Sequence, residues 1–483
     1  FDRYRILNRI LRKIRGDDFK LHIKGVDELI VTHETILFEA CNTSFQIHLQ
    51  MDPDTIVDKF NWAQLIAGPV LAVSSNSPLL MGRELWSETR IALFQQSLDV
   101  RNVSYLLRGQ KARVSFGSSW VKESILELYK DDIARYPPII TTDFKEDSLT
   151  ELKQGRIPKL RALSIFNGTL YKWNRLCYGI TAGVPHFRIE NRYIPSGPSV
   201  KDEIANTVFW IGLIQGMPDS YKKLYDKIPF NDARGNFTNA ARTGINTYFR
   251  WFGEIISAKK LILKKLLPIA REGLLKHGIE EKDVSKYLNI IRNRIETGQT
   301  GSVWQIQSKR VLRESFNKDM TNTTITACMY LNQLSNKPIH QWKLVDPEDC
   351  YTMDDKKKKL EKLMTTEVFV VDENDLVSLV DKVMQWKNIN HLPVVNKKNK
   401  LIGIISKTNI KHLDLSENKL LVVKDVMIRD VVTVGPKTTV EKAREIMIGK
   451  KIGCLPVLDN SNLVGILTKS DLINIYNPSS KHA

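Results

Sequence analysis

The segment His186-Phe-Arg-Ile-Glu-Asn-Arg-Tyr-Ile-Pro-Ser-Gly-Pro198 contains the clearest strand signal in the chain. Arg188, Glu190 and Arg192 alternate with other residues, so their side chains project from one strand face at about 6.6–6.8 Å intervals. A carboxylate between two guanidiniums stays ionised. Such a face could hold a hard divalent metal while the arginines clamp phosphate or carboxylate oxygens. The alternative is an exposed salt-bridge ladder between strands.

An earlier stretch alternates in the same way. Its apolar positions are Ile36, Phe38 and Ala40, followed by Phe45, Ile47 and Leu49. Ser44, Gln46 and His48 share the opposite face. The period predicts strands with one polar face, directed into a cleft or at solvent. An amide oxygen and an imidazole could bind a metal or a phosphate there, and a purely structural strand is the alternative.

Two helices are predicted between these strands. Ala63 to Leu80 is apolar but interrupted by polar residues and prolines, so it indicates a buried helix followed by a turn and not a membrane span. Leu85 to Arg101 interleaves apolar residues with polar ones, including Glu88 and Arg90, which cannot all be buried without partners. The second helix is therefore expected to face a cleft in part, with ordinary amphipathic packing as the alternative.

One pattern occurs twice near the C-terminus, with the copies 62 to 63 residues apart. The first copy contains Val368-Phe-Val-Val371, Asn390-His-Leu-Pro-Val-Val395 and Leu401-Ile-Gly-Ile-Ile-Ser-Lys-Thr-Asn409. The second contains Val431-Val-Thr-Val434, Gly453-Cys-Leu-Pro-Val-Leu458 and Leu463-Val-Gly-Ile-Leu-Thr-Lys-Ser-Asp471. Short apolar, β-branched runs flank a helical stretch in each, which predicts the order strand, helix, strand, strand, helix.

Size and charge narrow the class of protein. A chain of 483 residues suggests two to four domains. Its 72 Lys and Arg exceed 54 Asp and Glu, a net charge of +18 that favours anionic partners. No basic tail or recognition motif favours nucleic acid, so phosphorylated small molecules are the better expectation. The five cysteines form no Cys-x-x-Cys pair, which favours a reducing cytoplasm over a disulfide framework.

The repeat resembles a tandem cystathionine-β-synthase (CBS) domain pair over 362–477, a family whose pairs bind adenine nucleotides. Its ribose-contact run maps onto Gly465, Thr468 and Asp471 in the second copy. The first copy has Ser406 and then Asn409, which accepts through a single oxygen. The resemblance implies AMP or ATP as ligand and a homodimer or larger assembly. Helix capping by these side chains alone is the alternative.

Residues 20–310 resemble the glutamate–cysteine ligase type 2 (carboxylate–amine ligase) family, whose fold is like that of glutamine synthetase. The resemblance rests on Asn42-Thr-Ser-Phe-Gln-Ile-His-Leu-Gln50, Asn76-Ser-Pro-Leu-Leu80, Glu88-Thr-Arg-Ile-Ala-Leu-Phe-Gln-Gln96, Asn167-Gly-Thr-Leu-Tyr-Lys-Trp-Asn-Arg-Leu-Cys-Tyr-Gly179 and the 186–198 segment. It implies that Glu190 binds Mg²⁺ and that Arg192 clamps the transferring group. Arg188 and Arg90 are the other catalytic candidates, with His48 and Gln46 as contacts for ATP.

The resemblance also implies a reaction and a layout. ATP would phosphorylate a carboxylate, typically that of the glutamate side chain, and an amine would attack the acyl phosphate. We expect an α+β fold: an incomplete catalytic domain over 1–237, its helical part over 238–350, a linker over 351–361, and the CBS pair over 362–477. The family's early Gly-x-Glu-x-Glu-type metal motif is absent and the chain starts at Phe1 without Met, so we expect a fragment. The alternative is an inactive, nucleotide-sensing regulator with a ligase-like domain.

Overall fold

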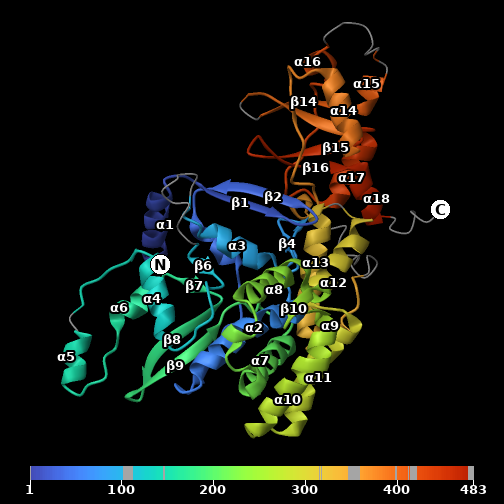
Figure 1. The fold of residues 1–483 in the computed structure, drawn as a ribbon. Coiled ribbons are helices and arrows are strands. Elements are labelled where there is room, and N and C mark those ends of the chain that lie inside the picture. Colours follow the sequence, from blue (N-terminus) through green and yellow to red (C-terminus); the bar gives the residue numbers. More distant parts are fainter. Residues whose placement is uncertain are drawn as a thin grey trace. The chain divides into compact units, whose positions relative to one another are not determined.

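The computed structural model describes residues 2–101, 112–144, 147–314, 316, 318–345, 359–397, 400–411, 413 and 421–476. The chain divides into two compact units (Figure 1). The first comprises Phe1–Ile306 and Met329–Lys343, and the second comprises Gln307–Cys328 and Leu344–Ala483. Helices α12 (Gly301–Arg313) and α13 (Lys318–Leu334) each contribute residues to both units. Most of the predicted linker at 351–361 lies outside the described residues.

The first unit mixes helices with small antiparallel sheets, which confirms the α+β class. Its further helices are α1 (Asp2–Arg15), α2 (Ile56–Ser74), α3 (Thr89–Ser97), α4 (Leu126–Arg135), α5 (Ser148–Lys153), α6 (Arg161–Asn167), α7 (Val200–Gln215), α8 (Phe230–Thr243), α9 (Ala258–Leu261), α10 (Leu267–Lys276) and α11 (Glu281–Thr297). Its strands are β1 (Phe19–Lys24), β2 (Glu28–His33), β3 (Ile47–Met51), β4 (Leu79–Leu80), β5 (Arg83–Glu84), β6 (Val114–Ser115), β7 (Tyr171–Lys172), β8 (Asn174–Thr181), β9 (Val184–Asn191), β10 (Tyr248–Trp251) and β11 (Glu254–Ser257).

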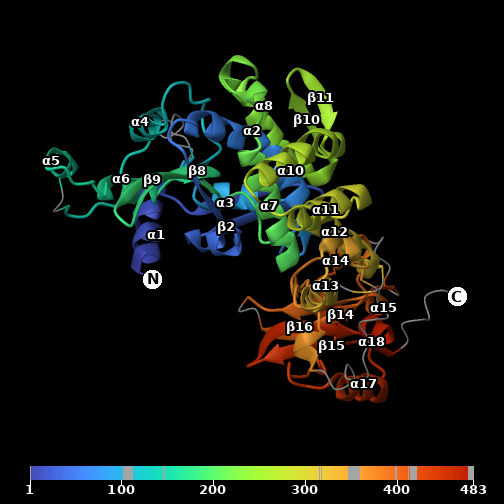
Figure 2. The same ribbon diagram turned by 90° about the horizontal axis from the view of Figure 1, so that it is seen from below.

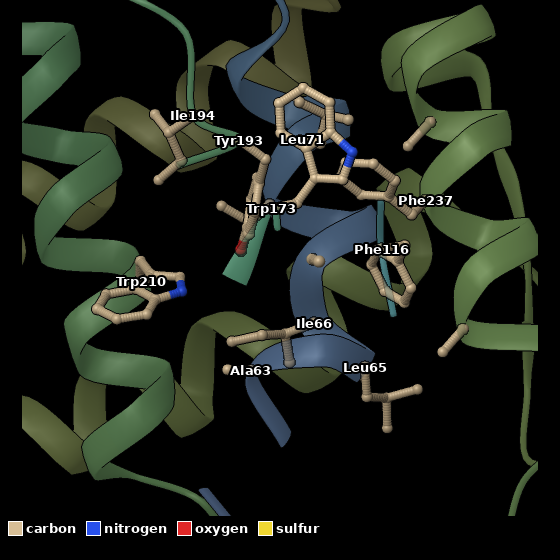
Figure 3. Packing of buried hydrophobic residues seen from close by; sticks show 14 of the residues in the cluster. Ala63, Leu65, Ile66, Leu71, Phe116, Trp173, Tyr193, Ile194, Trp210 and Phe237 are labelled. Carbon is tan, nitrogen blue, oxygen red and sulfur yellow. The ribbon is translucent and has the colours of Figure 1, made fainter. Parts of the chain in front are cut away.

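Helix α2 is the centre of the first unit. Nearly every side chain along it is buried, as expected of a helix that is apolar on all sides. It packs between α7 and α8, and α7 packs in turn on α10 and α11 (Figures 1 and 2). Figure 3 shows Leu71 of α2 among Trp173, Tyr193 and Phe237, which come from three other parts of the chain. The predicted buried helix is therefore confirmed, and it ends at Ser74.

Glycines permit a close contact between α7 and α10. A Cβ atom added to Gly273 of α10 would lie 2.3 Å from the carbonyl oxygen of Gly212 on α7. Any larger residue would push these two helices apart. Among the described residues, no helix combines the length and the apolar character needed to cross a membrane.

Two local predictions differ from the structure. The stretch Ile36–Cys41, predicted as a strand, is a short 3₁₀ helix, so apolar residues at every second position do not mark a strand there. The strand starts later, at Ile47. The predicted helical part of the ligase domain, 238–350, also contains the β10–β11 hairpin. The predicted domain boundary at 237/238 falls within α8.

The second unit contains the two repeats. The first has the predicted order of strand, helix, strand, strand and helix, whereas the predicted first strand of the second, Val431–Val434, forms only a single bridge between Val434 and Val457. The elements are β12 (Val371–Asp372), α14 (Val377–Lys387), β13 (His391–Val395), β14 (Leu401–Ser406), α15 (Lys407–Lys411), α16 (Val423–Val426), α17 (Val440–Gly449), β15 (Cys454–Asp459), β16 (Asn462–Thr468) and α18 (Lys469–Tyr476). The segment before each repeat pairs with the last strand of the other: Thr365 bridges Ile466, and Ile428 bridges Ile404. Each repeat therefore completes the other.

A buried ion pair joins α7 to α11 in the first unit. Arg294 Nη2 lies 2.8 Å from Asp202 Oδ1, and both side chains are almost fully buried. Asp202 Oδ2 accepts hydrogen bonds from Ser199 Oγ and from the backbone N–H of Ile339. Asp202 therefore ties three separate segments together.

We expect Asp202→Ala to lower the free energy of unfolding of the first unit by about 3–5 kcal/mol, because it leaves the Arg294 charge buried and unpaired. Denaturant unfolding followed by fluorescence measures this. Lys222→Ala is the control, since Lys222 pairs with Asp219 at the surface and such pairs contribute about 0–1 kcal/mol. Equal effects of the two substitutions would contradict the role given to Asp202.

Candidate active site

Three antiparallel strands, in the order β3-β9-β8, carry His48, Arg188 and Glu190 of the predicted site. Their register sets Glu190 of β9 opposite His48 of β3 on one side and opposite Arg175 of β8 on the other. The next row sets Arg188 opposite Gln50 and Cys177. The predicted strand is confirmed for Arg188 and Glu190, which lie on β9, whereas Arg192 lies just past its last residue, Asn191. Because side chains two apart share a face, both rows face the same side of the sheet.

A cavity of about 1110 Å³ opens over this face. Among its lining residues are Gln46, His48, Arg90, Arg188, Glu190 and Arg192, so the structure brings together all the ligase-site candidates. Segment 159–169, which includes α6, contributes another part of the lining. The cavity lies entirely within the first unit. It is large enough for a nucleotide or an amino acid, since ligand pockets typically measure ~300–1,000 Å³.

Glu190 is the most enclosed charge of the cavity, with 1% of its surface exposed. Its Oε2 lies 2.5 Å from Arg175 Nε, and its Oε1 lies 3.6 Å from His48 Nε2 and 3.8 Å from Arg192 Nη1. Burial alone would raise the pKa of Glu190, but Arg175 and then Arg192 outweigh it and hold the pKa below its usual value. The carboxylate is therefore ionised at neutral pH.

The arginines of the cavity differ in how they are held. Arg192 lies over the Tyr171 ring, 5.7 Å from its centroid, and burial followed by the nearby Arg175 lowers its pKa. Arg188 lines the cavity, and its buried Nε has no hydrogen-bond partner. An unpaired buried donor of this kind needs an acceptor, which the oxygen of an anionic ligand would supply.

Arg90, on α3, has a different environment. Its Nε donates to Glu88 Oε1 at 3.1 Å, its Nη1 to the Arg192 carbonyl at 3.5 Å, and its Nη2 to the Tyr193 carbonyl. The guanidinium thus holds the backbone of Arg192 and Tyr193, the two residues that follow β9. Glu88, which is fully buried, in turn accepts from the Asn76 backbone N–H.

His48 and Gln46 both line the cavity, beside the edge of the sheet. The His48 side chain is 41% exposed and touches Glu190 at the distance given above. Gln46 precedes β3 and is exposed. Both positions are open to a ligand, in agreement with the predicted polar face.

Sequence reasoning missed Arg175 and Cys177. Cys177 Sγ donates to Glu190 Oε2 at 3.4 Å, and burial raises the pKa of this thiol. The signal was available, because Asn174 to Gly179 follows the same alternation as β9 and places Arg175 and Cys177 on one face. What the sequence alone could not supply is the register that sets them against Glu190.

The residues present do not make up a magnesium site. Mg²⁺ needs several oxygen ligands, and within the described parts of the chain no three His, Cys, Asp or Glu side chains cluster in a way that could hold a metal. Glu190 supplies one carboxylate, and that carboxylate is already bound to Arg175. Glu190 as a metal ligand therefore stays a prediction that this geometry does not favour.

In the second unit, both predicted ribose contacts lie at helix starts. The backbone N–H and the Oγ1 of Thr468 each donate to Asp471 Oδ2 at 2.8 Å. Ser406 makes the equivalent two bonds to Asn409 Oδ1. The two copies thus share one capping arrangement, and the second copy carries the charged acceptor.

Comparisons with known proteins agree with both halves of this description. The family model for glutamate-cysteine ligase family 2 (GCS2) matches residues 20–322, and the CBS domain model matches 360–416 and 423–477. The inosine-5'-monophosphate dehydrogenase of Methanocaldococcus jannaschii is 36% identical over 117 residues, which are 24% of this chain and 23% of that protein. The homoserine O-acetyltransferase of Methanococcus vannielii is 25% identical over 206 residues, 39% of this chain and 41% of that protein. This chain therefore spans less than half the length of either relative.

Two solved structures are also similar. CBSX2 in complex with AMP is 27% identical, with 24% of this chain and 92% of that chain covered and a TM-score of 0.23. The CBS domain pair of protein MJ0100, in complex with 5-methylthioadenosine and S-adenosyl-L-methionine, is 27% identical, with 25% and 97% covered and a TM-score of 0.24. Because the ligase family model covers more than half of the residues and a CBS pair follows it, the chain belongs to glutamate-cysteine ligase family 2 and carries a tandem CBS pair in its C-terminal part.

Proposed function

We propose that this chain is an ATP-dependent carboxylate–amine ligase regulated by an adenine nucleotide at its CBS pair. The observation that carries the proposal is the group of Arg175, Arg188 and Arg192 beside one buried carboxylate in a large cavity. Such a face suits ligands with phosphate and carboxylate groups, because guanidiniums bind their oxygens in pairs. Family membership supplies the class of reaction.

In the proposed reaction, the terminal phosphoryl group of ATP moves to an oxygen of the substrate carboxylate, which yields ADP and an acyl phosphate. The amine nitrogen then attacks the carbonyl carbon, and phosphate leaves as the amide forms. The substrate we expect is glutamate, through its side-chain carboxylate. The protein contributes by holding the two reactants together and by neutralising the charge that develops on oxygen.

Each cavity residue has a role in this proposal. Arg188 and Arg192 neutralise the transferring group, and His48 with Gln46 contacts the nucleotide at the open edge of the sheet. Arg90 acts through Arg192, whose backbone carbonyl it holds. No step depends on a metal bound to Glu190, whose charge keeps the neighbouring arginines in place.

One observation favours a second candidate function, that of a regulator: among the described residues, no three His, Cys, Asp or Glu side chains form a cluster that could hold a metal ion. A nucleotide-responsive regulator without ligase activity would need only the CBS pair and a folded ligase-type unit. It predicts nucleotide binding with no ATP turnover for any combination of glutamate and amine.

We expect Arg188→Gln to lower kcat/KM for ATP-dependent amide formation by ~10²–10³-fold, the usual effect of removing one donor to a developing oxyanion. The folded structure should persist, because Arg188 Nε has no protein partner to lose. Coupled ADP release with glutamate and a panel of amines measures the rate.

The matched control is Arg135→Gln on α4, which removes the same charge from a surface pair with Asp131. Its rate should stay within about twofold of the wild type, as expected for an exposed pair. A wild-type rate in Arg188→Gln would contradict the assignment. Absence of turnover in the wild type, with nucleotide binding intact, would favour the regulator.

For the CBS pair, we expect Asp471→Ala to weaken binding of AMP or ATP to the second unit by about 10- to 100-fold. A charge-assisted hydrogen bond contributes ~1.5–3 kcal/mol against ~0.5–1.5 for a neutral one, and 1.4 kcal/mol is about tenfold. Asn409→Ala, the matched change in the first copy, should weaken binding much less. Calorimetric titration measures both variants.

The competing explanation is that Asp471 only caps α18, since it accepts from Thr468 in this structure. In that case Asp471→Ala would lower the melting temperature and leave nucleotide affinity unchanged. Equal losses of affinity in both variants would also contradict the proposed dominance of the second copy.

A further inference from the structure

Both oxygens of the Glu190 carboxylate face nitrogen or sulfur atoms of the protein. Arg175 Nε and Cys177 Sγ contact Oε2, at 2.5 and 3.4 Å. His48 Nε2 and Arg192 Nη1 approach Oε1, at 3.6 and 3.8 Å. The neighbours of this carboxylate are therefore two guanidiniums, an imidazole and a thiol.

A hard divalent cation would find poor ligands in this shell. Mg²⁺ binds oxygen atoms with octahedral geometry, whereas a guanidinium has no acceptor and carries a positive charge of its own. The described lining of the cavity has five cationic side chains against two acidic ones, Glu39 and Glu190. A cation that entered would have to displace Arg175 from a short, buried ion pair.

An anion meets the opposite situation in the same cavity. Arg188 stands one row along the sheet from Glu190 and Arg175, and its buried Nε lacks a hydrogen-bond partner. An anionic oxygen would accept a hydrogen bond from this Nε–H and would be attracted by the excess of positive charge. Glu190 would remain paired to Arg175 and would not compete for the ligand.

We propose that Arg175 takes, at Glu190, the place that a divalent cation would otherwise take, so that the cavity binds phosphate or carboxylate groups through its arginines and without a metal ion on Glu190. Glu190 is then a positioning residue, which holds Arg175 and Arg192 at the cavity floor. The inference rests on the proposed function only for the expectation that the ligand carries phosphates. Because anion binding is measured without turnover, it can hold even if the ligase reaction fails.

The test is calorimetric titration of the full chain with inorganic tripolyphosphate, in buffer with EDTA and in buffer with magnesium chloride. This probe lacks the ribose and adenine that the CBS pair is expected to recognise. We expect the wild type to bind at least as tightly in EDTA as in magnesium. Arg175→Ala should weaken binding in EDTA by about 10- to 100-fold, since it removes a positive charge from the cavity and leaves the Glu190 carboxylate free to repel the anion. Arg250→Ala, which removes an equal charge from an exposed site, should change it by less than about twofold.

A second measurement needs no arginine variant and guards against misfolding of Arg175→Ala. The nucleotide-free wild type and the Glu190→Gln variant would each be titrated with Mn²⁺, and bound ion would be followed by electron paramagnetic resonance. We expect the two proteins to bind the same amount of Mn²⁺, because no ion sits on Glu190. Tripolyphosphate binding that requires magnesium would overturn the proposal. So would a saturable Mn²⁺ site lost in Glu190→Gln, or wild-type anion affinity in a folded Arg175→Ala.

Discussion

Glu190 shares its row of the sheet with His48 on one neighbouring strand and Arg175 on the other, and the antiparallel register gives it these neighbours. The carboxylate is almost fully buried, so it depends on the cations beside it. Removing those cations would leave the Glu190 carboxylate buried and unpaired. Removing the carboxylate would leave several positive charges close together. The cavity floor is thus held by one carboxylate with guanidiniums around it.

The rest of the first unit supports this floor. Helix α2 is buried on all sides and packs between α7 and α8. Arg90 of α3 holds the carbonyls just after β9, and its own charge is balanced by buried Glu88. Rigid positioning of this kind suits a site that works by holding reactants and neutralising charge. The second unit is held together differently, because the segment before each repeat pairs with the last strand of the other repeat.

Much of this could be predicted from the sequence because the signals are local. The alternation through Arg188, Glu190 and Arg192 marks β9, and the duplicated Leu-Pro segments mark the two repeats. The 3₁₀ helix at Ile36–Cys41 could not be predicted, since period-2 apolar residues also occur in irregular segments. The pairing of Glu190 with Arg175 depends on strand register, and the role of Arg90 depends on a contact about a hundred residues away along the chain. Both are tertiary facts that no local pattern contains.

The proposed reaction depends on an acyl phosphate, and isotope transfer tests for this intermediate most directly. Glutamate labelled with ¹⁸O in its side-chain carboxylate would be incubated with the full chain, ATP and hydroxylamine, and the released phosphate examined by mass spectrometry. We expect each phosphate formed with the hydroxamate to carry one ¹⁸O atom, because a carboxylate oxygen leaves with the phosphoryl group. Unlabelled phosphate formed together with the hydroxamate, or no consumption of ATP at all, would contradict the proposed reaction.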